Sequence, residues 1–236
     1  MAVSLFVRTF LKLMLYFFIC ASCAVAIRMS LKISDEVFRK LLHFILLGSA
    51  VVLLNLFDTW HGAAIAPLIF AVLVYPLLSL AEHLKRYSQF MVERDSGEIK
   101  RSLLYVFAMF SVVIAISWGF IGEKYLALAV ILAWGVGDAA AALVGKNFGK
   151  RYIAGKYVDG KKTVEGSFAM FVASFAVITT ILAINTTLAW YYILIVSFIA
   201  ALVNSLVELN TKHGLDTITC PTALVLVMVP LWRLMR

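Results

Sequence analysis

The chain has 236 residues, of which 63% are hydrophobic and only 14% are charged. Its mean hydropathy is +0.97. Soluble domains contain about half apolar and about a quarter charged residues, so this composition excludes a soluble globular protein and indicates a polytopic membrane protein. The formal net charge of +8 requires no nucleic-acid partner, because cytoplasmic loops of membrane proteins are rich in Lys and Arg.

Long apolar stretches recur along the whole chain. Each has roughly 17 to 25 residues, the length that crosses about 30 Å of hydrocarbon. They predict an all-α bundle of about eight transmembrane helices, with seven as the alternative, in a single domain over residues 1–236. The expected spans are 9–27, 41–57, 62–81, 102–121, 125–145, 166–184, 188–208 and 218–235.

The first span has features of a secretion signal, since Arg8 and Lys12 precede an apolar run that ends in small residues at 21–26. A cleaved signal peptide has this pattern. Because one apolar stretch after another follows it along the chain, we expect an uncleaved first membrane span instead.

Basic residues are distributed unequally between the two sides of the predicted bundle. The loops after the first, third, fifth and seventh spans hold 16 of the 21 Lys and Arg residues. Cytoplasmic loops collect Lys and Arg. We therefore predict that these four loops lie in the cytoplasm and that both chain ends lie outside it.

A basic cluster opens the second span. It consists of Arg39, Lys40 and His43, of which Arg39 and His43 are four residues apart and so share one helix face. An ordinary juxtamembrane anchor has this composition, and so does a site for a nucleotide or a lipid head group. The residues alone leave both interpretations open.

The fifth span carries an aspartate inside an apolar segment. Asp138 lies about seven residues, or roughly 10 Å at 1.5 Å per residue, before the expected cytoplasmic end at Gly145. A carboxylate in hydrocarbon is costly and is usually functional. We expect it to bind Mg²⁺ or to accept the proton of an attacking hydroxyl, with a polar clamp between helices as the structural alternative. Gly135 and Gly137 beside it would let another backbone or a phosphate approach closely.

Residues 146–165, between the fifth and sixth spans, include six basic residues and three glycines. This composition suits a polyanion, because backbone N–H groups and cationic side chains both bind phosphate oxygens. Its last part, with Lys161–Ser167, is expected immediately before the sixth span, where the free N–H groups of a helix start favour a phosphate. A basic cytoplasmic loop without a ligand is the alternative.

A further polar group lies near the inner end of the seventh span. Asn204 and Glu208 are four residues apart, and Asp216 and Thr219 follow after a short loop. Polar residues within membrane spans are rare and usually pair with one another or mark a functional site. Because they are expected on the same side of the membrane as Asp138, we predict one shared site.

Taken together, these motifs resemble the family of CTP-dependent lipid-alcohol kinases (dolichol, phytol, polyprenol and diacylglycerol kinases), which is distantly related to the phosphatidate cytidylyltransferases. The resemblance is carried by Gly135–Lys150, Lys161–Ser167 and Arg39–His43. A further block of the family typically contains an acid, Asn, an apolar residue, Thr, an apolar residue and Pro. Residues 216–221 agree with it except that Thr217 replaces the Asn.

The resemblance implies a membrane kinase that transfers the γ-phosphoryl group of CTP to the hydroxyl of a polyprenol or dolichol, phytol or diacylglycerol at the cytoplasmic face, with Mg²⁺ bridging the phosphates. The partners are CTP, the lipid alcohol and the bilayer. The predicted catalytic residues are Asp138, Lys161 and Glu165, and the predicted metal ligands are Asp138 and Glu208. The predicted nucleotide-binding residues are Arg39, Lys40, Gly145, Lys146, Gly149, Lys150, Lys162, Thr163, Gly166 and Ser167. The residues predicted to contact substrate or to support the site are His43, Asn204, Glu208, Asp216 and Thr219.

Two other functional classes stay open. A phosphatidate cytidylyltransferase, which makes CDP-diacylglycerol from CTP and phosphatidate, shares the lysine-threonine-glutamate-glycine run. The C-terminal block typical of that family has only a faint counterpart here, at residues 212–216. A transporter or a lipid-binding membrane protein is the non-enzymatic alternative. The sequence does not identify the lipid alcohol or the oligomeric state.

Overall fold

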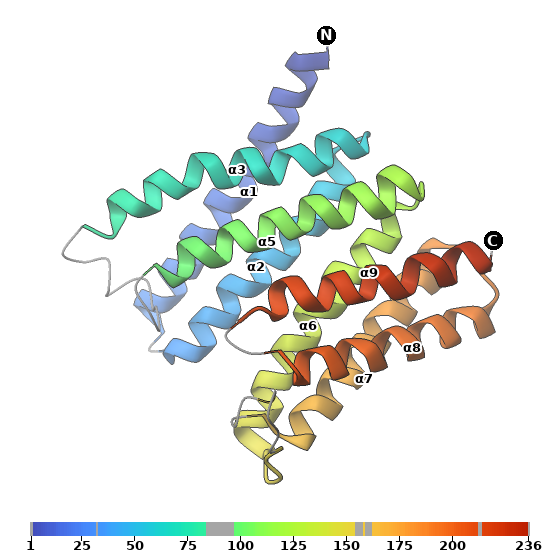
Figure 1. The fold of residues 1–236 in the computed structure, drawn as a ribbon. Helices are drawn as coiled ribbons and strands as arrows, with labels where there is room; N and C mark the ends of the chain where they lie inside the picture. Colours follow the sequence, from blue (N-terminus) through green and yellow to red (C-terminus); the bar gives the residue numbers. More distant parts are fainter. Residues whose placement is uncertain are drawn as a thin grey trace. The chain divides into compact units, whose positions relative to one another are not determined.

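The computed structural model describes residues 2–31, 33–83, 97–153, 158, 162–211 and 214–235. The chain divides into two compact units, Met1–Val112 and Val113–Arg236, and each is described by itself. The described residues are helical and contain no strand (Figure 1), which confirms the predicted all-α class. The single domain expected from the sequence stays a prediction.

The first unit is held together by aromatic side chains. Phe17 lies against Phe70, with ring centroids 4.1 Å apart, and Phe70 lies 5.1 Å from Phe107. Rings at these separations contribute more than their buried area alone. The unit consists of α1 (Ala2–Ser30), α2 (Asp35–Leu56), α3 (Trp60–Ala81) and most of α5 (Glu98–Ile114).

The second unit places four helix ends close together. Helix α6 packs along α7, α7 along α8 and α8 along α9. Because successive helices run in opposite directions, the end of α6, the start of α7, the end of α8 and the start of α9 lie at the same end of this unit (Figure 1). Its elements are η1 (Ala115–Phe120), α6 (Lys124–Phe148), α7 (Val164–Asn185), α8 (Trp190–Leu209) and α9 (Asp216–Leu234).

Glycines allow α6 and α7 to approach each other closely. A Cβ atom on Gly166 would lie 2.9 Å from the Ala141 carbonyl oxygen and 3.3 Å from the Gly145 Cα, and one on Gly137 would lie 2.6 Å from the Ser174 hydroxyl. Small residues at helix crossings are typical of membrane bundles, where backbones approach each other directly. Helix packing therefore accounts for these three glycines without any ligand.

Eight helices of the described chain are long and apolar enough to cross a membrane, so the protein is a multi-pass membrane protein and the expected span number is confirmed. Several helices extend beyond the sequence-based limits. Helix α6 continues through Lys146 to Phe148. Helix α7 begins at Val164 because the Thr163 hydroxyl accepts a hydrogen bond from the Gly166 N–H, as an N-cap does. Helix α7 thus begins two residues before the expected span of 166–184, and Glu165, Gly166 and Ser167 all lie in its first turn rather than ahead of the helix.

Candidate functional site

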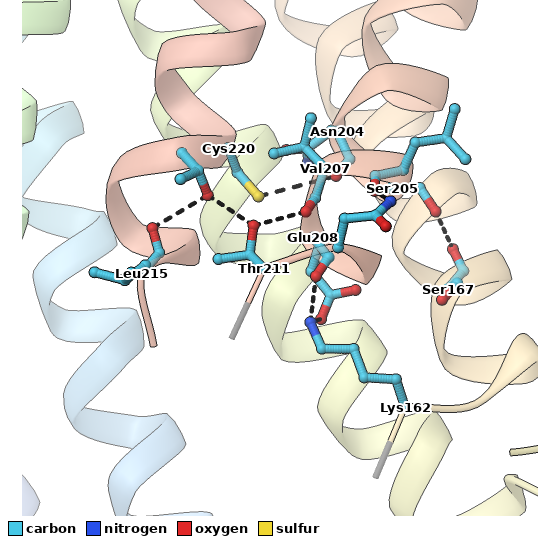
Figure 2. Close-up of polar contacts among 12 residues, drawn as sticks. Lys162, Ser167, Asn204, Ser205, Val207, Glu208, Thr211, Leu215 and Cys220 are labelled. Atoms are coloured by element: carbon cyan, nitrogen blue, oxygen red, sulfur yellow. Dashed lines mark hydrogen bonds and ion pairs between the residues drawn. The ribbon is translucent and has the colours of Figure 1, made fainter. Parts of the chain in front are cut away.

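The shared end of the second unit contains a buried ion pair. The Lys162 Nζ donates to Glu208 Oε1 at 2.5 Å and also to the Glu208 backbone carbonyl (Figure 2). The two side chains are only 17% and 11% exposed, so each charge has lost most of its water. A charge in such a position needs a partner, and this pair joins the start of α7 to the end of α8.

Two further acids act on the same glutamate. Glu208 interacts electrostatically with Asp138 of α6 and with Asp216 of α9, in addition to Lys162. Residues separated by up to about 80 positions in sequence are thus brought into one electrostatic environment. Asp138 and Asp216, which come from two other helices, therefore both influence the charge of Glu208.

A buried polar cluster lies next to the Asp138 turn. Asn204 is fully buried, and its Nδ2 donates to the Ser174 hydroxyl at 2.9 Å and to the Ala133 carbonyl at 3.3 Å. The Ser174 hydroxyl donates to the same carbonyl at 3.0 Å. Helices α7 and α8 thereby bind the turn of α6 that precedes Asp138. Asn204, predicted to support the site, contacts the helix that carries the aspartate.

The connection between α8 and α9 is fixed by hydroxyl groups. Thr211 donates to the Val207 carbonyl at 2.7 Å and shares a 3.0 Å hydrogen bond with Thr219 (Figure 2). The Cys220 thiol lies 3.9 Å from the Asn204 carbonyl oxygen. These contacts hold the start of α9, and with it Asp216, beside the end of α8.

The motif at the start of α7 makes contacts with both neighbouring helices. Thr163 caps α7 and also packs against α6, since a Cβ on Gly145 would lie 3.1 Å from its hydroxyl and one on Gly149 would lie 2.7 Å from its methyl group. The Ser205 hydroxyl of α8 donates to the Ser167 carbonyl at 2.8 Å. The predicted nucleotide-binding residues Gly145, Gly149 and Thr163 thus have packing contacts that exist without a nucleotide.

Both ends of the basic segment between α6 and α7 are bound to each other. Ile153 N–H donates to the Lys162 carbonyl at 2.9 Å, and Val164 N–H donates to the Arg151 carbonyl at 3.0 Å. Glu165 Oε2 accepts from the backbone N–H groups of Lys150 at 3.2 Å and Arg151 at 3.3 Å. The segment therefore leaves and re-enters the helical bundle at one place, beside the acids described above.

Other predicted residues lie elsewhere. Lys161 lies outside the described residues, so its catalytic role stays a prediction. Arg39, Lys40 and His43 belong to α2 of the first unit, where Arg39 lies 3.9 Å from Glu36, and their role stays a prediction too. Lys146 and Lys150 are exposed at the end of α6 and just after it.

Several residues of this region were not predicted. Ser174, Ser205, Thr211 and Cys220 all make contacts that fix the site helices. Serine, threonine and cysteine are common within apolar spans, and no spacing in the sequence distinguishes these four from others. Glu208, in contrast, stood out as an acid within a span.

The acidic side chains limit how this protein could hold a metal ion. Within the described ranges, no three or more His, Cys, Asp or Glu side chains are grouped so as to hold a metal ion. Mg²⁺ in nucleotide sites often takes only one or two protein carboxylates, with phosphates and waters as its other ligands. Asp138 fits that smaller requirement, whereas the other predicted ligand, Glu208, binds Lys162. No family model, curated protein or solved structure matches the chain.

Proposed function

We propose that this protein is a CTP-dependent kinase that transfers the γ-phosphoryl group to the hydroxyl of a membrane lipid alcohol at the cytoplasmic membrane face. The observation that carries the proposal is the ion pair between Lys162 and Glu208 at one end of the second unit, together with the electrostatic influence of Asp138 and Asp216 on Glu208. Beside this pair the chain that leaves α6 is bonded to the chain that enters α7, through Ile153 and Lys162 and through Arg151 and Val164. Asp138, Lys162 and Asp216 belong to the motifs that resemble the lipid-alcohol kinase family.

The location suits a reaction between a soluble nucleotide and a lipid. The positive-inside distribution predicts that the loop after α6 faces the cytoplasm, where CTP is available. Asp138 lies within α6, ten residues before its end, so the proposal requires the hydroxyl of the lipid alcohol to enter between the helices to reach it.

The proposed reaction requires no covalent intermediate between the protein and the phosphoryl group. In the transfer, the lipid hydroxyl oxygen bonds to the γ-phosphorus, the bond from that phosphorus to the β–γ bridging oxygen breaks, CDP leaves, and the hydroxyl proton passes to a base. Positioning and charge neutralisation dominate such reactions. Asp138 is the proposed base or metal ligand, and the cationic residues of segment 146–163 neutralise the triphosphate. Bound Mg²⁺, held by Asp138, would neutralise further phosphate charge.

Product analysis tests the proposal. The purified protein in liposomes is given CTP labelled at either the α- or the γ-phosphate, together with dolichol, phytol or diacylglycerol, or with phosphatidate. A kinase transfers γ-label to a lipid alcohol and releases CDP. Transfer of α-label to phosphatidate with release of pyrophosphate would indicate a cytidylyltransferase, and no transfer of either label would exclude both enzymes.

Membrane orientation is tested by cysteine labelling. In a variant whose three native cysteines are replaced by alanine, a cysteine at Asn147, exposed at the end of α6, should react only with an impermeant reagent on the cytoplasmic side. A cysteine at Thr187, in the connection between α7 and α8, should react only from the other side. The reverse pattern would place segment 146–163 away from cytoplasmic CTP and would contradict the proposed function.

A further inference from the structure

A single carboxylate oxygen connects the first turn of α7 to the chain that leaves α6. Glu165 Oε2 accepts two successive backbone N–H groups, those of Lys150 and Arg151. Neither contact can be read from the sequence, because the acceptor and its donors are 14 and 15 residues apart. The two bonds add to the pairing of Arg151 with Val164, the first residue of α7, and of Ile153 with Lys162.

These bonds bear on what Glu165 can do in a reaction. A general base needs a lone pair within hydrogen-bond reach of the proton that it removes. Oε2 already accepts two main-chain donors, those of Lys150 and Arg151, so a base role would fall to Oε1 and would disturb this anchoring when the carboxylate became protonated. Loss of this acceptor would remove two bonds between α7 and the chain that leaves α6, while the Arg151–Val164 backbone bond and the Thr163 cap would remain.

We propose that Glu165 is a positioning residue, whose carboxylate binds the backbone of Lys150 and Arg151 and so holds these two residues in the arrangement that receives an anionic ligand. The identity of this ligand as the triphosphate of CTP rests on the proposed function. The anchoring of Lys150 and Arg151 by the Glu165 carboxylate is independent of that function. Glu165 then differs from Asp138, which is proposed to act on the reacting groups.

Two substitutions separate positioning from catalysis. Glu165→Gln keeps an amide oxygen that can accept the same two N–H groups, whereas Glu165→Ala removes the acceptor. Amide hydrogen exchange of residues 149–153 is measured by mass spectrometry on the detergent-solubilised full chain. It shows, without any nucleotide, whether Glu165 protects the backbone N–H groups of Lys150 and Arg151. We expect exchange to be about tenfold faster in Glu165→Ala and within about threefold of wild type in Glu165→Gln, because exposed amides exchange through local opening.

A matched control and a kinetic readout complete the test. Glu123→Ala removes an acid at the opposite end of α6 that makes no side-chain capping bond, and it should leave exchange at 149–153 unchanged. In the CTP assay, Glu165→Ala should raise the apparent KM for CTP about fivefold or more, whereas Glu165→Gln should keep kcat within about threefold of wild type, because a positioning defect is largely one of binding.

The outcomes are distinct. Unchanged exchange at 149–153 in Glu165→Ala, with exchange in the rest of α7 as in wild type, would overturn the anchoring. A loss of kcat in Glu165→Gln as large as that in Glu165→Ala would show that the carboxylate charge acts in the reaction and would overturn the positioning role. If wild type itself transfers no phosphate from CTP, the proposed function fails while the exchange data still decide whether Glu165 anchors Lys150 and Arg151.

Discussion

The contacts described above between helices differ in kind between the two units of this protein. In the first unit, the rings of Phe17, Phe70 and Phe107 fill the space between helices. In the second, Gly145 and Gly166 bring two backbones together, and Asn204 crosses from α8 to the α6 backbone. Bulky rings fill space without needing polar partners, whereas small residues bring polar groups of different helices within hydrogen-bond distance.

Close helix packing in the second unit brings polar groups of different helices together. Close backbones at the crossing of α6 and α7 place the turn before Asp138 near side chains of α7 and α8. The ion pair between Lys162 and Glu208 joins the start of α7 to the end of α8. The second unit should therefore be sensitive to changes that are small in volume or remove one charge. The first should tolerate apolar changes that keep most of the volume.

The largest effect on stability is expected from breaking the ion pair. Lys162→Met leaves Glu208 without its partner at a largely buried position, and the loss of one partner from such a pair costs about 3–5 kcal/mol. The double variant Lys162→Met/Glu208→Met should recover most of this loss. Unfolding in mixed detergent micelles measures both.

Lys124→Met is the matched control for that change. Lys124 opens the opposite end of α6, where its ammonium lies 5.0 Å from the centre of the Tyr125 ring. An exposed interaction of this kind contributes about 0.5–1 kcal/mol, so the control should be far milder. A Lys162→Met variant as stable as Lys124→Met would show that the ion pair does not hold the site helices together.

A smaller effect is expected from adding one methyl group at the glycine crossing. Gly166→Ala places a Cβ 2.9 Å from the Ala141 carbonyl oxygen and 3.3 Å from the Gly145 Cα. Because both are backbone atoms, α6 and α7 must separate, at a cost of about 1–3 kcal/mol. Phe107→Leu in the first unit should cost about 1.5 kcal/mol or less, although it changes more atoms. The opposite ranking in thermal unfolding would contradict the contrast between the units.

The smallest expected effect comes from the polar cluster behind Asp138. Ser174→Ala removes the hydroxyl that joins Asn204 to the Ala133 carbonyl. Hydrogen bonds between membrane helices contribute about 0.6 kcal/mol on average and about 1.7 kcal/mol at most. Stability should fall within that range, as measured by the same unfolding assay. The same substitution at Ser111, whose hydroxyl bonds within its own helix, should have less effect.

Much of the architecture could be predicted from the sequence, because spans of apolar residues and the loops between them have strong compositional signals. The spans around Asp138 and Glu208 were found in this way. Helix ends were harder to place, since the Thr163 cap that starts α7 depends on one side-chain hydrogen bond. The six-residue π-helical segment η1 had no signal in the sequence at all.

The candidate site was predicted in part. Acids inside apolar spans are conspicuous, so Asp138 and Glu208 were identified. The contact of Lys162 with Glu208 was not anticipated, and the nucleotide-binding role of Lys162 stays a prediction. Lys162 and Glu208 are 46 positions apart, so their contact depends on how α7 and α8 pack. The hydrophobic periodicity of the sequence does not specify that packing. In the sequence, a glycine such as Gly137 could serve either close helix packing or the approach of a phosphate. The packing distances show that close helix packing alone accounts for it.

The most direct test of the proposed kinase site is the substitution Asp138→Asn, which keeps the size of the side chain and removes its charge. We predict that transfer of the γ-phosphate from CTP to the lipid alcohol falls at least about 100-fold at saturating Mg²⁺, because loss of a key electrostatic group in an active site typically costs this much. The variant should still insert and melt like wild type. Activity within about threefold of wild type would contradict a catalytic or metal-binding role for Asp138 and, with it, the placement of the reaction at this end of the second unit.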